Sequence, residues 1–322
     1  MSTARTDKSS PGDSLPLPPA VASQILRLIG TDNLSVHDHV EAVQKDPTLT
    51  ARILRYVNSS LPGIPREIGT IERAVAMLGL YTMHIIALGF SVLEILPTDD
   101  RGGFDSPAYW RRLLTTAVAG QLLAGAVCPM LAEQAFVAGL LSDLGAVGAG
   151  RSIPRGRTSA LQAMAPEQTP AGAEQGDQGL TRAAKSHGIL REWGFPEALC
   201  DAVGASRAEG LEALSGPTLD VGRIVHSAAA IAALFSGDVP ISELDAIKAQ
   251  CRTETGIEGT VLEDILLVLN ERLRATASVF SVEVGETLDY AQLAAEAPME
   301  ISRPCHPPAG QRLCAAPASR HD

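Results

Sequence analysis

The feature that most constrains this chain is a succession of apolar stripes at helical spacing, each preceded by residues that favour a helix start. Ser35 stands three residues before Asp38, which is a capping-box pattern, and Asp46 precedes Pro47, a residue favoured in the first helical turn. We expect helices at about 21–29, 35–43, 46–57, 70–78, 80–96, 106–127, 131–147, 180–193, 196–203, 219–235, 242–249, 260–280 and 288–294. No segment reads convincingly as a strand, so the pattern predicts an all-α protein.

Composition agrees with helices that pack through small side chains. Apolar residues make up 45% of the chain and aromatic residues only 4%, which is unlike an aromatic-rich β-sandwich. The formal net charge of −11 repels nucleic acid and anionic lipid, so we expect neither as a partner. The five cysteines are widely spaced without a C-x-x-C pair, and the polar N-terminus has no signal-peptide pattern. We therefore expect reduced thiols and a cytoplasmic protein.

Two long apolar stretches, 74–93 and 113–131, have the length of membrane spans. The first contains Gly79, Thr82 and His84, and the second is rich in Ala, Thr and Gly. Neither has the density of Leu, Ile and Phe that drives insertion into a bilayer. We interpret both as core helices.

The domain organisation follows from shifts in composition. We expect a disordered N-terminus at 1–14, a main helical domain at 15–237, a helical C-terminal extension at 238–298 and a disordered tail at 299–322. Residues 150–178 are rich in Gly, Pro, Gln and Ser without apolar periodicity, which predicts a loop or disordered insert in the main domain.

Four local patterns occur in an order and spacing similar to one known family. They are Leu17-Pro18-Pro19 with Asp46-Pro47-x-Leu49 and Val57-Asn58-Ser59; the I-x-x-A-V-x-x-L-G stretch from Ile71 to Gly79; the Ala138 to Gly145 segment A-G-L-L-S-D-L-G; and Leu190-x-x-Trp193-Gly194-Phe195-Pro196. Together they resemble the HDOD family, a bacterial signalling module related to the HD metal phosphohydrolases. The resemblance implies a multi-helix HD-like bundle in which an N-terminal helical half packs on a degenerate HD-type half.

In HD enzymes, His and Asp side chains hold divalent ions that polarise phosphoryl oxygens and generate hydroxide. The resemblance places the corresponding ligand positions of this chain at Arg112, Ser142-Asp143, Arg182, Ser206-Arg207 and Ala229. Arginine stays protonated and offers only hydrogen-bond donors, so it cannot ligate a metal. The resemblance therefore implies a lost metal site, no cofactor and no catalytic residue, with Asp143 as a vestigial ligand.

The four charged residues at these positions, Arg112, Asp143, Arg182 and Arg207, have two interpretations. Asp143, expected within an apolar helix, pairs with an arginine because a buried charge needs a partner. Alternatively, the arginines form a pocket for a phosphate or carboxylate. We expect the charge pair.

Histidines outside these positions are expected to have no metal role. His37 and His39 flank Asp38, but side chains two residues apart on a helix point about 200° from each other, so both cannot bind one ion. We expect a solvated helical turn there. His187 and His226 are expected to be hydrogen-bonded structural residues, and the glycine-rich run 145–150 a helix end, not a phosphate loop.

The principal functional hypothesis is a non-catalytic regulatory module that acts through protein–protein contacts. The resemblance implies signalling proteins of the kinase, cyclase or response-regulator classes as partners. One alternative is a sensor that binds an anionic ligand in the vacated pocket. The other is a divergent metal-dependent phosphohydrolase acting on cyclic nucleotides.

Overall fold

The computed structural model describes residues 20–29, 35–60, 67–96, 105–148, 182–206, 211–212, 214–291 and 293. The segments predicted to be disordered, 1–14, 150–178 and 299–322, lie outside these residues. Within the described ranges the protein is all-α and has no strand, as predicted.

Helices follow one another along the whole described chain. The N-terminal part comprises α1 (Ala20–Ile29), α2 (Val36–Gln44), α3 (Pro47–Ser60), α4 (Ile71–Leu78), α5 (Leu80–Val92) and the 3₁₀ turn η1 (Leu93–Ile95). The remainder comprises α6 (Ser106–Val127), η3 (Pro129–Leu131), α7 (Ala132–Leu141), α8 (Gly145–Gly148), α10 (Arg182–Glu192), α11 (Glu197–Gly204), α13 (Gly216–Phe235), η5 (Ile241–Glu243), α14 (Leu244–Thr255) and α15 (Gly259–Phe280).

The predicted start signals are present as side-chain caps. Ser35 and Asp38 form the expected capping box, since the Asp38 amide donates to Ser35 Oγ at 3.3 Å and the Ser35 amide donates to Asp38 Oδ2 at 2.8 Å. Asp46 Oδ1 accepts hydrogen bonds from the amides of Thr48 at 2.8 Å and Leu49 at 2.9 Å. These bonds satisfy amide groups that have no carbonyl partner in the first helical turn.

One predicted helix, 131–147, is broken in the structure. Helix α7 ends at Leu141, a turn covers 142–144, and the glycine-rich run begins a short helix, α8, instead of ending a long one. The physical reason lies in a neighbouring helix: the Gly145 amide donates to the Ser186 hydroxyl of α10 at 2.8 Å. The prediction that Asp143 lies within a helix was therefore wrong, and this residue occupies the turn.

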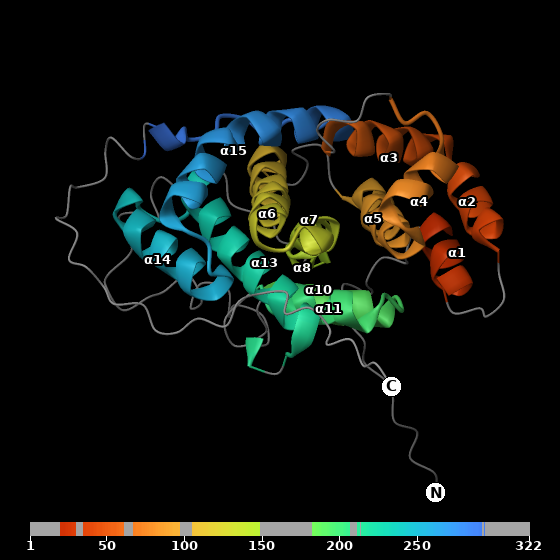
Figure 1. The fold of residues 1–322 in the computed structure, drawn as a ribbon, viewed down its shortest axis with the longest axis horizontal. Coiled ribbons are helices and arrows are strands. Elements are labelled where there is room, and N and C mark those ends of the chain that lie inside the picture. The colour runs from red at the N-terminus through yellow and green to blue at the C-terminus, as the bar shows by residue number, and fades with distance from the viewer. Residues whose placement is uncertain are drawn as a thin grey trace, which may run out of the picture.

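The elements are arranged along one long axis (Figure 1). Helices α1 to α5 lie at one end, α6 and α7 occupy the middle, and α13 and α14 lie toward the other end, while α15 runs along one side from α14 to α3. Helix α6 packs against α7, α13 and α15. Buried apolar side chains from α1 through α15 form one continuous core.

One described helix, α13, is long and apolar enough to cross a membrane. The α4–α5 pair passes the same test only when both helices are counted together, and a bend of 120° separates them. This bend occurs at Gly79, which has a φ of 83° that glycine adopts without strain. More than half of the apolar window of α13 is buried inside the protein, and the helix packs on α6, α7, α11 and α14. Its surroundings are those of a core helix.

The described cysteines differ in redox state. Cys200 and Cys251 are free and buried, as expected. Cys128 is disulfide-bonded, so the expectation of a reduced thiol is wrong for this residue.

Candidate functional site

The candidate site is built on the corner where α7 ends, because this corner carries Asp143. Helix α7 reaches α6 only because residue 139 is glycine: a Cβ there would lie 2.8 Å from Ala117 Cα and 2.9 Å from the Thr116 carbonyl oxygen. Gly145 allows an equally close approach to α10, where a Cβ would lie 2.5 Å from the Arg182 carbonyl oxygen. The two glycines therefore bring the corner against both neighbouring helices.

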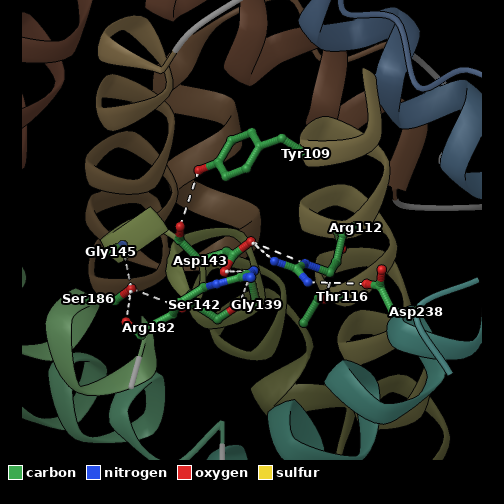
Figure 2. Close-up of polar contacts among 10 residues, drawn as sticks. All are labelled: Tyr109, Arg112, Thr116, Gly139, Ser142, Asp143, Gly145, Arg182, Ser186 and Asp238. Carbon is green, nitrogen blue, oxygen red and sulfur yellow. Dashed lines mark hydrogen bonds and ion pairs between the residues drawn. The ribbon is translucent and has the colours of Figure 1, made fainter. Parts of the chain in front are cut away.

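The Asp143 carboxylate lies between two guanidinium groups (Figure 2). Arg112 of α6 donates to Asp143 Oδ2 through Nη2 at 2.8 Å and through Nε at 3.2 Å. Arg182, the first residue of α10, lies on the other carboxylate oxygen, with its Nη1 at 3.4 Å from Oδ1. Both carboxylate oxygens are therefore engaged by arginine.

Arg112 also binds a second carboxylate. Its Nη1 donates to Asp238 Oδ2 at 3.1 Å, in the turn that follows α13. Burial lowers the pKa of the Arg112 guanidinium, but Asp143 and Asp238 outweigh this effect and raise the pKa above its ordinary value. Arg112 is therefore a permanent cation that joins α6 to the corner and to the α13 turn.

Hydrogen bonds from α10 hold the corner in this conformation. The Ser186 hydroxyl donates a hydrogen bond to the Ser142 carbonyl oxygen at 2.9 Å, and it accepts a hydrogen bond from the Gly145 amide. The Tyr109 hydroxyl lies at 3.5 Å from the Asp143 carbonyl oxygen, and burial followed by the Asp143 charge raises the pKa of this phenol. The backbone on both sides of Asp143 is thus held by side chains of α6 and α10.

Three of the four predicted site residues, Arg112, Asp143 and Arg182, meet at this corner. The fourth, Arg207, lies outside the described residues. Sequence reasoning missed Asp238, because the alignment with the family sought the last carboxylate near Ala229. No local pattern marks Asp238 in the sequence, and only the packing of α13 on α6 brings it to Arg112.

The side chains at this corner do not fit the metal that HD enzymes hold. The groups nearest the Asp143 carboxylate are guanidinium groups, which offer only donors and place positive charge where a cation would sit. In the described part of the chain, no three His, Cys, Asp or Glu side chains are grouped so that they could hold a metal ion.

The histidines of α2 differ from the prediction of a solvated turn. His37 is exposed, but His39 is buried, and its Nδ1 lies 3.0 Å from Nε2 of His84 on α5. The prediction was wrong for His39 because His84, 45 residues further along the chain, packs against its ring. Burial, followed by the charge of His39, lowers the pKa of His84 to about 4.

The two other histidines are hydrogen-bonded, as predicted. Nε2 of His187 lies 3.2 Å from Asp201 Oδ1, which joins α10 to α11. Nδ1 of His226 lies 2.7 Å from Glu254 Oε1, which joins α13 to α14. Both are contacts between neighbouring helices.

Comparison with known proteins identifies the fold. The chain resembles the crystal structure of a candidate phosphohydrolase from Shewanella amazonensis, with 24% identity and a TM-score of 0.59, over 82% of this chain and 95% of that chain. It also resembles an HDOD domain protein of unknown function from Geobacter sulfurreducens, with 21% identity and a TM-score of 0.61, over 83% of this chain and 94% of that chain.

A third solved structure, a candidate signal transduction protein from Marinobacter aquaeolei, is 19% identical with a TM-score of 0.51, over 88% of this chain and 60% of that chain. At these identities the three structures show a shared fold. No curated protein matches the chain. The family model of the HDOD domain matches residues 15–208, which is more than half of the chain. The protein therefore belongs to the HDOD domain family.

Proposed function

We propose that this protein is a non-catalytic signal-transduction module that acts through protein–protein contacts. The observation that carries the proposal is the position of Arg112 and Arg182 on opposite oxygens of the Asp143 carboxylate. The Asp143 side chain is only 12% exposed, so its charge is largely withdrawn from solvent and needs these partners. A carboxylate held in this way serves the packing of α6, α7 and α10.

Phosphohydrolysis of the HD type requires divalent ions that polarise the phosphoryl group and supply hydroxide. Arg112 and Arg182 oppose a metal at Asp143 both by their charge and by their lack of lone pairs. These features favour a regulatory role over the divergent phosphohydrolase considered from the sequence.

The charges at the corner also bear on the alternative of an anion sensor. The two guanidinium groups of Arg112 and Arg182 are matched by the two carboxylates of Asp143 and Asp238. Among these four residues the net charge is zero, so a phosphate would have to displace a carboxylate from an arginine. We therefore favour the charge-paired corner over the anion pocket.

The partner class comes from the family and from relatives of the same fold. The protein of this fold from Marinobacter aquaeolei is named as a candidate signal transduction protein. We propose a signalling protein of the kinase, cyclase or response-regulator class as the partner of this chain, in the cytoplasm. The net charge of −11 disfavours nucleic acid and anionic membrane surfaces.

Metal analysis and hydrolysis assays test the absence of catalysis. The purified protein is expected to carry no stoichiometric divalent metal after incubation with Mn²⁺, Mg²⁺ or Fe²⁺. We also expect no hydrolysis of cyclic dinucleotides or cyclic mononucleotides above the rate that an Asp143→Asn control shows. Stoichiometric metal together with turnover that the Asp143→Asn variant loses would overturn the proposal.

A thermal-shift titration with inorganic phosphate and cyclic dinucleotides tests the sensor alternative. We expect no saturable rise in Tm for the wild-type protein. A saturable rise that is lost in both Arg112→Ala and Arg182→Ala, but kept in the exposed control Arg191→Ala, would favour the anion pocket.

A further inference from the structure

A second polar cluster, which shares no residue with the Asp143 corner, joins α13 to α14. His226 and Ser227 come from α13, and Gln250 and Glu254 come from α14. Glu254 Oε1 lies 2.7 Å from His226 Nδ1, and the Ser227 hydroxyl donates to Glu254 Oε2 at 2.6 Å. Both oxygens of the Glu254 carboxylate are engaged, so this carboxylate is fixed beside the imidazole ring of His226.

The contact with Glu254 fixes the tautomer of His226. An ionised carboxylate only accepts hydrogen bonds, so Nδ1 of His226 carries a proton and donates it to Glu254. The amide nitrogen of Gln250, at 3.1 Å from Nδ1, is itself only a donor and does not compete for this proton. In the neutral ring the free lone pair is therefore on Nε2.

Nε2 of His226 is the ring nitrogen that the fold leaves open. Within the described part of the chain it makes no hydrogen bond, and it is not one of the polar atoms that are buried without a partner. Nε2 therefore reaches the surface of the protein, although the side chain as a whole is only 19% exposed. His187 has the opposite arrangement, because its Nε2 lies on Asp201.

The surroundings of Nε2 favour a phosphoryl group over a metal ion. A histidine with a carboxylate on one nitrogen and an open second nitrogen is typical of metal ligands and of nucleophiles. Among the described residues, no three His, Cys, Asp or Glu side chains are grouped to hold a metal. Arg223 lies one turn before His226 on the same side of α13, half-buried and without an ion pair to any described residue. Its guanidinium is suited to bind phosphoryl oxygens.

We propose that His226 accepts a phosphoryl group at Nε2 from a donor of the phosphoramidate class, such as the phosphohistidine of a partner protein. The Nε2 lone pair forms the new N–P bond while the P–N bond of the donor breaks, and the leaving nitrogen takes a proton from solvent. Glu254 keeps Nδ1 protonated and supports the positive charge that the ring gains. Arg223 binds the phosphoryl oxygens. The proposal does not depend on the function proposed for Asp143.

Potassium phosphoramidate is the probe for this proposal, because it is a small donor of the same class. The full-length protein is incubated with it, and the modified residues are located by mass spectrometry of peptides and by ³¹P NMR. We expect phosphorylation of His226 at least about tenfold faster than that of the exposed His37 on α2. In urea-unfolded protein the two histidines should react at the same rate, because the contact with Glu254 is lost.

Substitutions around the ring separate this site from an ordinary surface histidine. Each effect is measured as the ratio of the His226 rate to the His37 rate in the same chain. Glu254→Gln removes the charge with little change of shape and is expected to lower this ratio about tenfold. Arg223→Gln is expected to lower it about fivefold. Arg252→Gln makes the same change at an exposed position of α14, two residues from Glu254 and so on another side of the helix, and should leave the ratio unchanged.

Three outcomes would overturn the proposal. They are the absence of phosphorylation at His226, a rate at His226 no higher than that at His37, and an unchanged ratio in both Glu254→Gln and Arg223→Gln. Circular dichroism shows whether each variant folds. If Glu254→Gln does not fold, Arg223→Gln alone decides: a lowered ratio supports the site and an unchanged ratio rejects it.

Discussion

At the scale of single residues, Arg112 links α6 to the Asp143 corner and to the turn that follows α13. Its guanidinium joins Asp143 and Asp238, which belong to turns 95 residues apart. The Arg112 side chain is 23% exposed, so water screens these pairs only in part. Removing one partner from such a pair leaves the other charge poorly compensated.

Arg112→Leu is therefore expected to lower the free energy of unfolding by about 2 kcal/mol, measured by urea denaturation. The control is Arg191→Leu, which breaks the exposed Arg191–Glu197 pair and is expected to cost less than about 0.5 kcal/mol. Equal stabilities of these two variants would contradict a structural role of the corner.

The burial of His84 beside His39 makes stability depend on pH. The pKa of His84 is lowered from 6.5 to about 4 in the folded protein. As pH falls below 6.5, the unfolded chain binds a proton at this residue before the folded protein does. The stabilising contribution is therefore complete above pH 6.5 and is lost as pH falls from 6.5 to about 4.

This loss is expected to amount to about 3 kcal/mol in the free energy of unfolding. The measurement is urea denaturation at several pH values between 7 and 4. His84→Leu should reduce the dependence on pH in this window, whereas His37→Asn, which changes an exposed histidine of α2, should keep it. If His84→Leu and the wild type showed the same pH dependence of stability, His84 would not be its cause.

At the scale of elements, the contact between α6 and α7 depends on a residue without a side chain. A Cβ at Gly139 would meet the backbone of Ala117 and Thr116 at 2.8 and 2.9 Å, and backbone atoms cannot move aside as a flexible side chain can. The helices would have to separate, which would also shift Asp143 away from Arg112.

Gly139→Ala is accordingly expected to lower the free energy of unfolding by about 2 kcal/mol through overpacking. Gly125→Ala makes the same change on α6 at an exposed position with nothing within 4 Å of the added Cβ. It should raise stability by about 0.5 kcal/mol because alanine favours a helix. Thermal unfolding of the two variants should thus move in opposite directions, and a stabilising Gly139→Ala would refute the close approach.

At the scale of the whole molecule, α15 joins the two ends of the helical array (Figure 1). It packs on α6 and α3, and two arginines reinforce the contact with α3. Arg55 of α3 donates to the Val279 carbonyl oxygen at 2.8 Å, and Arg272 of α15 donates to the Ser59 carbonyl oxygen at 3.2 Å. The C-terminal extension thus completes the common core.

Leu269 is fully buried on α15, and Leu269→Ala is expected to lower the free energy of unfolding by about 3 kcal/mol. The protein should still unfold in a single cooperative transition, at a lower midpoint than the wild type. Leu267→Ala, at a position 55% exposed on the same helix, should change stability by less than about 0.5 kcal/mol. Trp110 and Trp193 fluorescence should follow the same transition as the helical circular dichroism signal. Separate transitions would indicate that α15 and the remaining helices fold independently.

Much of the fold could be predicted from the sequence because its signals are local. The Ser35–Asp38 box, the Asp46 cap and the stop at Gly79 depend on residues within one helical turn, and all are present in the structure. The break after Leu141 could not be predicted from local patterns. The Gly145 amide donates to the Ser186 hydroxyl of α10 instead of to a carbonyl oxygen of its own helix, and α10 is distant in the sequence.

The sequence by itself determined the helices and the family, since both depend on residue type and short spacing. The replacement of metal ligands by arginine stays a prediction from the resemblance. Only the tertiary structure decided which groups meet. Asp238 pairs with Arg112, and His84 packs against His39, both through contacts between elements that are distant in the sequence. Such contacts depend on how the helices pack in three dimensions, and local sequence patterns do not predict that packing.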